Sequence, residues 1–323
     1  MHGPRRQSDP AAGRRAARTG SRALSASADA RTELSIEIPV RRFDLDLTVR
    51  SHGWYDLPPF DWDAEAGRLQ FVFLEEERPV AVELVKRGGT LLARASGGGA
   101  DRVQSVVFRV LDLSSDLSSF HALCRAKEAE GFGWIARRGA GRVLRAPTPF
   151  EDAVKVLLTT NCSWGLTRAM VGNLVQAFGR GGAFPDAPFL AGYSEKSLRE
   201  EIRCGYRARY LLAFAGRVAS QRLDVARWED AARADEDVER EIAAQPGFGP
   251  YAVQTLLRLL GRHAKLGLDS WSRKKVSELR FRSRRVPDRR VERLYGPFGP
   301  WAGLAFWLDV TRDWHEKTER LWP

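Results

Sequence analysis

The stretch that decides the fold is IAAQPGFGPYAVQTLLRLLG, residues 242–261. Apolar residues at helical spacing predict one helix up to Ala244 and a second helix from Pro250, whose fixed φ suits the first helical position. The sequence PGFG at 246–249 predicts a tight hairpin between them, because glycines permit turn conformations that other residues resist. Phe248 is expected to fill the apolar angle between the two helices.

This hairpin has a chemical consequence. Gly247 and Gly249 leave backbone N–H groups uncovered at a helix N-terminus, where the helix dipole also favours an anion. That is the sequence form of a helix-hairpin-helix, which grips a DNA phosphate through main-chain amides. The candidate DNA-binding hairpin therefore comprises Pro246, Gly247, Phe248, Gly249 and Tyr251. An ordinary turn between two helices with a glycine cap has the same local pattern, so the hairpin alone does not decide the function.

Composition favours a polyanionic partner. The chain of 323 residues carries a formal net charge of +11, and its pI is about 10.0. A basic balance of this size indicates nucleic acid first and an anionic membrane surface second. General arginine-rich usage is the alternative explanation.

Cysteines and hydropathy narrow the class of protein further. Cys124, Cys162 and Cys204 are scattered, so neither a disulfide framework nor a four-cysteine zinc or iron–sulfur site is expected. The histidines show no paired metal spacing, and we expect no metal site. No apolar run approaches the ~20 residues of a membrane helix, and the start of the chain lacks the apolar core of a signal peptide. These features predict a cytoplasmic, nucleoid-associated protein, with a transit peptide as a weak alternative.

Patterning along the chain predicts an α+β protein. Residues 1–33 almost lack large apolar side chains and are expected to form a disordered basic tail. Alternating apolar and polar residues over 34–117 predict an antiparallel β-sheet domain. Its expected strands are 34–40, 43–49, 68–74, 79–87, 90–96 and 104–113, with an aromatic, proline-bearing loop at 53–62.

Helical periodicity replaces the strand pattern over 118–323. We expect a two-lobed, all-α helix-hairpin-helix domain there, with no internal repeat. The predicted helices are 118–129, 149–161, 164–179, 194–202, 207–220, 235–245, 250–261 and 301–317.

A second motif follows the hairpin. In KLGLDSWSRKKV, residues 265–276, Asp269 lies 20 residues beyond Gly249. Here the chain resembles the helix-hairpin-helix/GPD superfamily of DNA glycosylases, in which a Gly-Pro/Asp-rich loop delivers an aspartate at this distance from the hairpin. The positions that match are Pro246, Gly247, Gly249, Ala252 and Asp269.

Two upstream segments extend the resemblance. TPFEDAVKVLLTTNCSW (148–164) looks like the opening helix of the 3-methyladenine DNA glycosylase II and 8-oxoguanine glycosylase branches. That likeness implies that Asn161, with Cys162 beside it, is the wedge that enters the gap left by a flipped base. GYRARYLLAFAGRV (205–218) is very similar to a segment of 8-oxoguanine glycosylases. The candidate contacts to the DNA backbone are Arg207, Arg209, Arg273 and Lys274.

The resemblance implies that Asp269 is the catalytic carboxylate. Cleavage of a glycosidic bond develops positive charge on the sugar, which a nearby carboxylate stabilises. An N-cap for a helix starting near Trp271 is the alternative role for Asp269, and the two roles are compatible. Tyr251 and Trp271 are the candidate lining of the base pocket, while most other aromatic residues are expected to lie in the core.

One position departs from the pattern. Bifunctional members carry a Schiff-base lysine two residues after the second hairpin glycine, and here that residue is Tyr251. The resemblance therefore implies a monofunctional enzyme of base excision repair without lyase activity. Its expected partner is double-stranded DNA with a damaged base, bound by a monomer without membrane contact. No cofactor is expected, although a monovalent or divalent cation at the hairpin is compatible with the pattern.

The substrate is the least constrained part of this interpretation. An alkylated purine such as 3-methyladenine or 7-methylguanine is favoured, because a cationic base leaves readily and is attracted to aromatic faces. Asn161 and the segment at 205–210 favour an oxidised base of the 8-oxoguanine type instead. A non-catalytic helix-hairpin-helix DNA-binding protein is the remaining alternative.

Overall fold

The structure is a computed structural model that describes residues 33–316. The predicted disordered tail at 1–33 lies outside the described residues except for Glu33, and so do residues 317–323. The boundary predicted between 117 and 118 stays a prediction.

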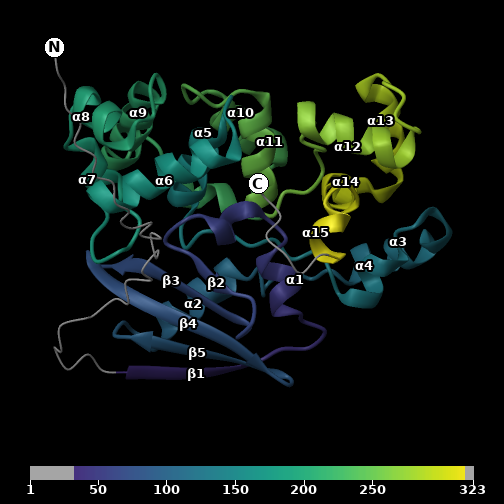
Figure 1. Ribbon diagram of the computed structural model, residues 1–323, viewed down its shortest axis with the longest axis horizontal. Helices are drawn as coiled ribbons and strands as arrows, with labels where there is room; N and C mark the ends of the chain where they lie inside the picture. The colour runs from purple at the N-terminus through teal and green to yellow at the C-terminus, as the bar shows by residue number, and fades with distance from the viewer. Residues whose placement is uncertain (1–32, 317–323) are drawn as a thin grey trace, which may run out of the picture. The chain divides into compact units, whose positions relative to one another are not determined.

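The N-terminal part is a five-stranded antiparallel sheet, as expected (Figure 1). Its strands pair in the order β1-β5-β4-β3-β2. One face of the sheet carries the alternate apolar residues that the period-2 pattern predicted, and these side chains are buried. The strands are β1 (Glu33–Pro39), β2 (Asp61–Asp63), β3 (Arg68–Glu75), β4 (Arg78–Arg87) and β5 (Thr90–Ser96).

Two predicted strands were wrong. Residues 43–49 form the helix α1 (Leu45–Val49), because the Asp44 carboxylate accepts a hydrogen bond from the Leu47 amide at 3.0 Å and caps it. Residues 104–110 belong to the helix α2 (Ala100–Val110), whose buried valines recur at positions 103, 106, 107 and 110, and residues 111–113 form a turn after it. That spacing is helical, and it was mistaken for a strand because valine favours strands. The sheet therefore ends at Ser96, and α2 packs on it.

The helical part confirms the predicted periodicity. The predicted helix at 301–317 is two helices that meet at Thr311, and α4, α7 and α13 were not predicted. The helices are α3 (Ser118–Ala126), α4 (Gly133–Arg138), α5 (Pro149–Thr159), α6 (Trp164–Phe178), α7 (Ala187–Ala191), α8 (Glu195–Ile202), α9 (Arg207–Ala219), α10 (Asp235–Ala243), α11 (Pro250–Leu259), α12 (Ser270–Arg280), α13 (Asp288–Tyr295), α14 (Ala302–Val310) and α15 (Arg312–Glu316). Short 3-10 helices are η1 (Gly53–Asp56), η2 (Glu128–Glu130), η3 (Val225–Glu229) and η4 (Gly296–Trp301).

These helices form two groups (Figure 1). In one group, α5 packs against α6, α9 and α11, while in the other α14 packs against α12 and α13. The loop between α11 and α12 connects the two groups, so residues from both converge near Asp269. Among residues 33–316, no helix has the length and apolar character needed to cross a membrane.

A buried histidine makes the fold sensitive to acid. His263 is buried, and its ring stacks on Trp301 with 5.6 Å between ring centroids. Burial, followed by the cationic Arg145 and Arg258, lowers the pKa of His263 from 6.5 to about 3. The folded state therefore binds fewer protons than the unfolded chain between these pH values. The stability that neutral His263 contributes is present above pH 6.5 and is lost as the pH falls toward 3.

We predict that His263→Phe flattens the acid limb of the stability profile. Phe keeps the ring against Trp301 but has no proton to bind. Between pH 6 and pH 4, the free energy of unfolding of the wild type should fall faster than that of the variant by about 1.4 kcal/mol per pH unit. Urea denaturation at a series of pH values measures this difference, and parallel profiles for the two proteins would contradict it.

Candidate active site and DNA-binding groove

The hairpin between α10 and α11 has the predicted form. Phe248 is buried and packs on Phe214 of α9, with ring centroids 5.3 Å apart, so it anchors the hairpin in the core. Gly247 has φ +90°, and a Cβ there would lie 2.7 Å from Leu157 Cδ1. Gly249 is the N-cap of α11 with an ordinary φ of −75°, and a Cβ there would meet nothing within 4 Å. The fold thus requires glycine at position 247 and does not require it at position 249.

The hairpin amides face a groove. Phe248 N–H donates to Gln245 O at 3.2 Å, whereas within residues 33–316 no acceptor bonds the amides of Gly247 and Gly249. The groove, about 920 Å³ in volume, runs from these amides past Tyr206 and Asn161 to Asp269. An open pair of amides beside a helix N-terminus is the geometry that binds an anion.

Asp269 is the N-cap of α12, so the capping role anticipated for it is confirmed. Its Oδ1 accepts from the Ser272 amide at 2.7 Å, and Ser272 Oγ accepts from the Asp269 amide at 2.9 Å. This reciprocal pair is a capping box, which fixes the orientation of the carboxylate. In the described part of the chain, no donor bonds the second carboxylate oxygen, Oδ2. One oxygen therefore holds the helix, and the other is available for chemistry.

Beyond Asp269 lies a second cavity of about 270 Å³ with largely aromatic walls. The structure brings the predicted residues Tyr251, Trp271, Asp269 and Cys162 together around it. Its full lining is His52, Gly53, Trp54, Thr159, Cys162, Trp164, Thr167, Tyr251, Thr255, Arg258, Gly267, Asp269, Trp271, Ser272, Trp307 and Trp314.

Four tryptophans in this lining were not among the predicted pocket residues, since most other aromatic residues were expected in the core: Trp54, Trp164, Trp307 and Trp314. They come from η1, α6, α14 and α15. Trp307 and Trp314 are seven residues apart, a helical spacing, whereas no local pattern marks Trp54 and Trp164 as their neighbours. Trp314 contacts both Trp271 and Trp307, with centroids 5.5 and 5.4 Å away. The cavity therefore offers several ring faces to a flat ligand.

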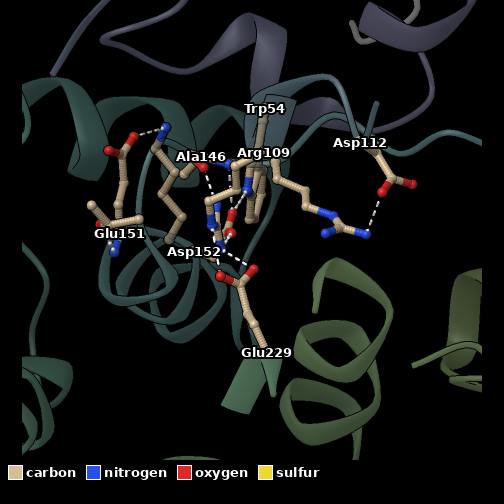
Figure 2. A network of polar contacts seen from close by, with 10 residues as sticks. Trp54, Arg109, Asp112, Ala146, Glu151, Asp152 and Glu229 are labelled. Atoms are coloured by element: carbon tan, nitrogen blue, oxygen red, sulfur yellow. Dashed lines mark hydrogen bonds and ion pairs between the residues drawn. The ribbon is translucent and has the colours of Figure 1, made fainter. Parts of the chain in front are cut away.

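A buried polar network holds one wall of the cavity (Figure 2). Trp54 Nε1 donates to Asp152 Oδ1 at 2.6 Å. Asp152 also accepts from the Ala146 amide and from Arg109, each at 2.9 Å, and Arg109 pairs with Glu229. Residues from η1, α2, α5 and η3 are thus tied together behind the wall.

Arg258 is the main residue of the cavity that sequence reasoning missed. It follows Tyr251 and Thr255 on one face of α11, a helical spacing that was visible in the sequence. Its side chain lies over the ring of Trp307 at 4.4 Å and donates to Leu266 O at 3.0 Å. Burial lowers the pKa of Arg258 to about 10, so it remains a cation at neutral pH.

Two further groups in the lining are neutral at neutral pH. Burial, with the nearby cations Arg258 and Lys155 adding to it, lowers the pKa of His52 to about 3. Burial also raises the pKa of the Tyr251 phenol, with the Asp269 carboxylate adding to that shift. Asp269 and Arg258 are therefore the charged groups of this cavity within residues 33–316.

The wedge candidates lie where the groove meets the cavity. Asn161, in the loop between α5 and α6, is exposed with φ +48°, and its Nδ2 donates to Tyr206 Oη at 3.3 Å. Cys162 lines both spaces, and its Sγ donates to Leu158 O at 3.3 Å. The loop thus presents a polar side chain directly beside the path between them.

The four candidate backbone contacts differ in exposure. Arg207 is buried, bonds Thr160 O and stacks over Tyr206, so it supports the Asn161 loop. Arg209 is exposed, and its Nη2 donates to Tyr210 Oη at 2.7 Å. Arg273 pairs with Asp288, and Lys274 is exposed near Glu278. Within residues 33–316, no three His, Cys, Asp or Glu side chains gather as a metal site.

Comparisons with known proteins give fold matches only. No protein-family model and no curated protein sequence matches the chain. A structure of MBOgg1 with a low-affinity DNA ligand matches with a TM-score of 0.69 and 21% identity, over 88% of this chain and 96% of that chain. The apo-form of the Clostridium acetobutylicum 8-oxoguanine glycosylase/lyase matches with a TM-score of 0.66 and 20% identity, over 85% of this chain and 95% of that chain.

A third structure represents the alkylated-base branch. The 3-methyladenine DNA glycosylase from Archaeoglobus fulgidus matches with a TM-score of 0.68 and 17% identity, over 86% of this chain and 98% of that chain. The neighbours thus come from both branches that the sequence resembles. The chain has the α+β fold of the helix-hairpin-helix/GPD DNA glycosylases.

Proposed function

We propose that this protein is a monofunctional DNA glycosylase that flips a damaged purine out of double-stranded DNA and hydrolyses its glycosidic bond with Asp269. The observation that carries the proposal is the position of Asp269, which lines both the groove at the hairpin and the aromatic cavity. A nucleotide that passes from a duplex in the groove into the cavity brings its sugar past this carboxylate.

The groove suits the DNA. The free amides of Gly247 and Gly249 are donors for a phosphate, and the net charge of +11 adds long-range attraction to a duplex. Extrusion of a base costs a few kcal/mol of stacking and pairing. Asn161, exposed on its loop beside the groove, is placed to enter the gap and offset part of that cost.

The chemistry needs one carboxylate. As the bond breaks, positive charge develops on the sugar, and Asp269 Oδ2 is free to stabilise that charge or to orient the attacking water. The capping box holds the carboxylate in place before the substrate arrives, so little reorganisation is needed during the reaction.

The lining of the groove and the cavity supports a glycosylase without lyase activity. Tyr251 occupies the position of the Schiff-base lysine and cannot form an imine. Among the described residues that line the groove and the cavity, none is a lysine. The proposed products are a free base and an intact abasic strand.

The aromatic walls support an alkylated purine as substrate. A cationic methylated base already leaves readily, and each ring face attracts such a cation by about 0.5–2 kcal/mol. An oxidised base of the 8-oxoguanine type is the second candidate, and the buried cation Arg258 favours it because a neutral base with carbonyl oxygens can accept its hydrogen bonds.

We predict that Asp269→Asn lowers single-turnover excision by at least about 100-fold, because the charge that stabilises the transition state is lost. Asparagine caps helices as well as aspartate does, so the fold and the DNA affinity should be retained. Asp237→Asn, the same change at an exposed position of α10, is the matched control, and Ser272→Ala shows separately how much of the loss comes from the capping box, since it breaks the box and keeps the carboxylate. Base release by Asp269→Asn at the wild-type rate would support a non-catalytic DNA-binding protein instead.

Replacing each hairpin glycine with serine should show which glycine is needed for DNA affinity and which is needed for stability. Gly249→Ser introduces a good N-cap for α11, so stability should be unchanged or higher. Its side chain also stands in the open space beside the Gly247 and Gly249 amides, so DNA affinity should fall about 10-fold or more. Gly247→Ser should lower stability, because its φ of +90° and the contact with Leu157 exclude a side chain. Thermal melts and fluorescence anisotropy measure the two effects. Unchanged affinity in a folded Gly249→Ser protein would exclude the amide grip.

Borohydride reduction tests the absence of lyase chemistry. During base release, the wild-type protein should form no covalent adduct with DNA, and the abasic strand should stay uncut until heated in alkali. A bifunctional glycosylase in a parallel reaction shows that trapping works. An adduct that gel electrophoresis detects with the purified protein would contradict the assignment.

A further inference from the structure

Arg258 is built into the cavity with most of its N–H donors unpaired, and its buried Nε has no acceptor among residues 33–316. It is 3% exposed, and it lines the inner wall. A guanidinium has five N–H donors, yet within residues 33–316 one acceptor, Leu266 O at 3.0 Å, bonds it. Leaving charged donors buried and unpaired is costly, so this arrangement fits a site that an acceptor completes.

The surrounding loop is shaped around this guanidinium. Gly267 has φ +70°, and a Cβ at that position would lie 2.7 Å from Arg258 Nη2. Trp307 supports the opposite face at 4.4 Å. The side chain is therefore held in one position, which a donor needs in order to form selective hydrogen bonds with one edge of a ligand.

No neighbouring group satisfies the cation directly. Asp269 lines the same cavity, but the described residues show no ion pair between it and Arg258 within 4.0 Å. His52 is neutral, and the other polar side-chain groups of the lining are hydroxyls, a thiol and indole N–H groups, none of which is an anion. The cavity thus has a carboxylate where it meets the groove and a cation with free donors deeper inside.

This polarity distinguishes purines by the group at position 6. Guanine and hypoxanthine carry a carbonyl oxygen there, which accepts hydrogen bonds from arginine. Adenine and its methylated forms carry an amino group, whose donors would face the donors of Arg258 and leave both unpaired. Position 6 is across the ring system from the glycosidic nitrogen, so a base whose sugar lies at Asp269 directs that edge inward.

We propose that Arg258 makes the cavity selective for 6-oxopurines, that is, for damaged bases derived from guanine or hypoxanthine, over 6-aminopurines. The inference rests on the proposed function and narrows its substrate class. 7-Methylguanine, 8-oxoguanine and hypoxanthine fall inside this class, and 3-methyladenine falls outside it.

Binding of free bases tests the selectivity without any reaction. The five tryptophans in the lining report occupancy through their fluorescence. Hypoxanthine and adenine are both neutral at pH 7.5, and they differ in the oxo or amino group at position 6 and in the proton that the oxo form carries on N1. Hypoxanthine should quench the wild type with a Kd about 10-fold or more below that of adenine. Equal Kd values for the wild type would overturn the proposal, whatever the variants do.

Variants assign the preference to the side chain. Arg258→Met keeps the volume and removes the donors, so the preference should disappear, while Arg258→Lys should retain part of it. Arg240→Met, an exposed change on α10, is the matched control and should behave as the wild type. Thermal melts establish which variants fold. If Arg258→Met does not fold, the wild type and Arg258→Lys carry the test. A folded variant at 258 that keeps the full wild-type preference would overturn the role of Arg258.

Release from methylated DNA separates this inference from the proposed function. Such DNA carries 7-methylguanine and 3-methyladenine together. The ratio of the two released bases is compared between the wild type and Arg258→Met, so the difference in their intrinsic lability is the same in both proteins and drops out. The ratio should fall about 10-fold or more in the variant. Release of both bases with an unchanged ratio would overturn the inference and leave the glycosylase standing. Arg258-dependent hypoxanthine binding, with no base released from methylated, 8-oxoguanine or hypoxanthine DNA, would overturn the enzyme and leave the selectivity.

Discussion

The buried carboxylate of Asp152 is the interaction on which the rest of the site depends. It is fully buried and accepts from three donors, which belong to Trp54, Arg109 and Ala146. A buried ion that loses one partner destabilises a protein by about 3–5 kcal/mol, because the remaining charge is uncompensated. The η1 segment between β1 and β2, the helix α2 and the helix α5 are therefore fixed relative to one another. This is why Trp54, which comes from outside the helical part, can serve as a wall of the cavity (Figure 2).

Much of the fold and part of the site could be predicted from the sequence because their signals are local. The hairpin at 246–249, the α11 start at Pro250 and the cap at Asp269 each depend on residues within a few positions. A local signal also gave a wrong prediction for α2. Its valines favour a strand as a residue type, whereas their spacing of three and four residues is helical.

The rest of the cavity could not be read in the same way. Trp54, Trp164 and Trp307 become neighbours only through packing of η1, α6 and α14. An aromatic residue in a core and one in a cavity wall have the same sequence signature, because both are apolar residues on a buried face. Arg258 was different: a lone arginine on the buried face of α11 is rare enough to mark a site, and its spacing from Tyr251 and Thr255 was visible in the sequence.

The order of charges along the path of a flipped nucleotide connects these observations. At the groove, free amides and the dipole of α11 offer positive potential to a phosphate. Next comes the Asp269 carboxylate, where positive charge would develop on the sugar. Deepest is the guanidinium of Arg258, which offers donors to the base. If the Asp269 carboxylate and the Arg258 guanidinium formed an ion pair, the carboxylate would not be free to stabilise charge on the sugar. The guanidinium would not be free to donate hydrogen bonds to the base. Their separation within one cavity keeps both available, and the capping box and the Gly267 turn are the local structures that hold them apart.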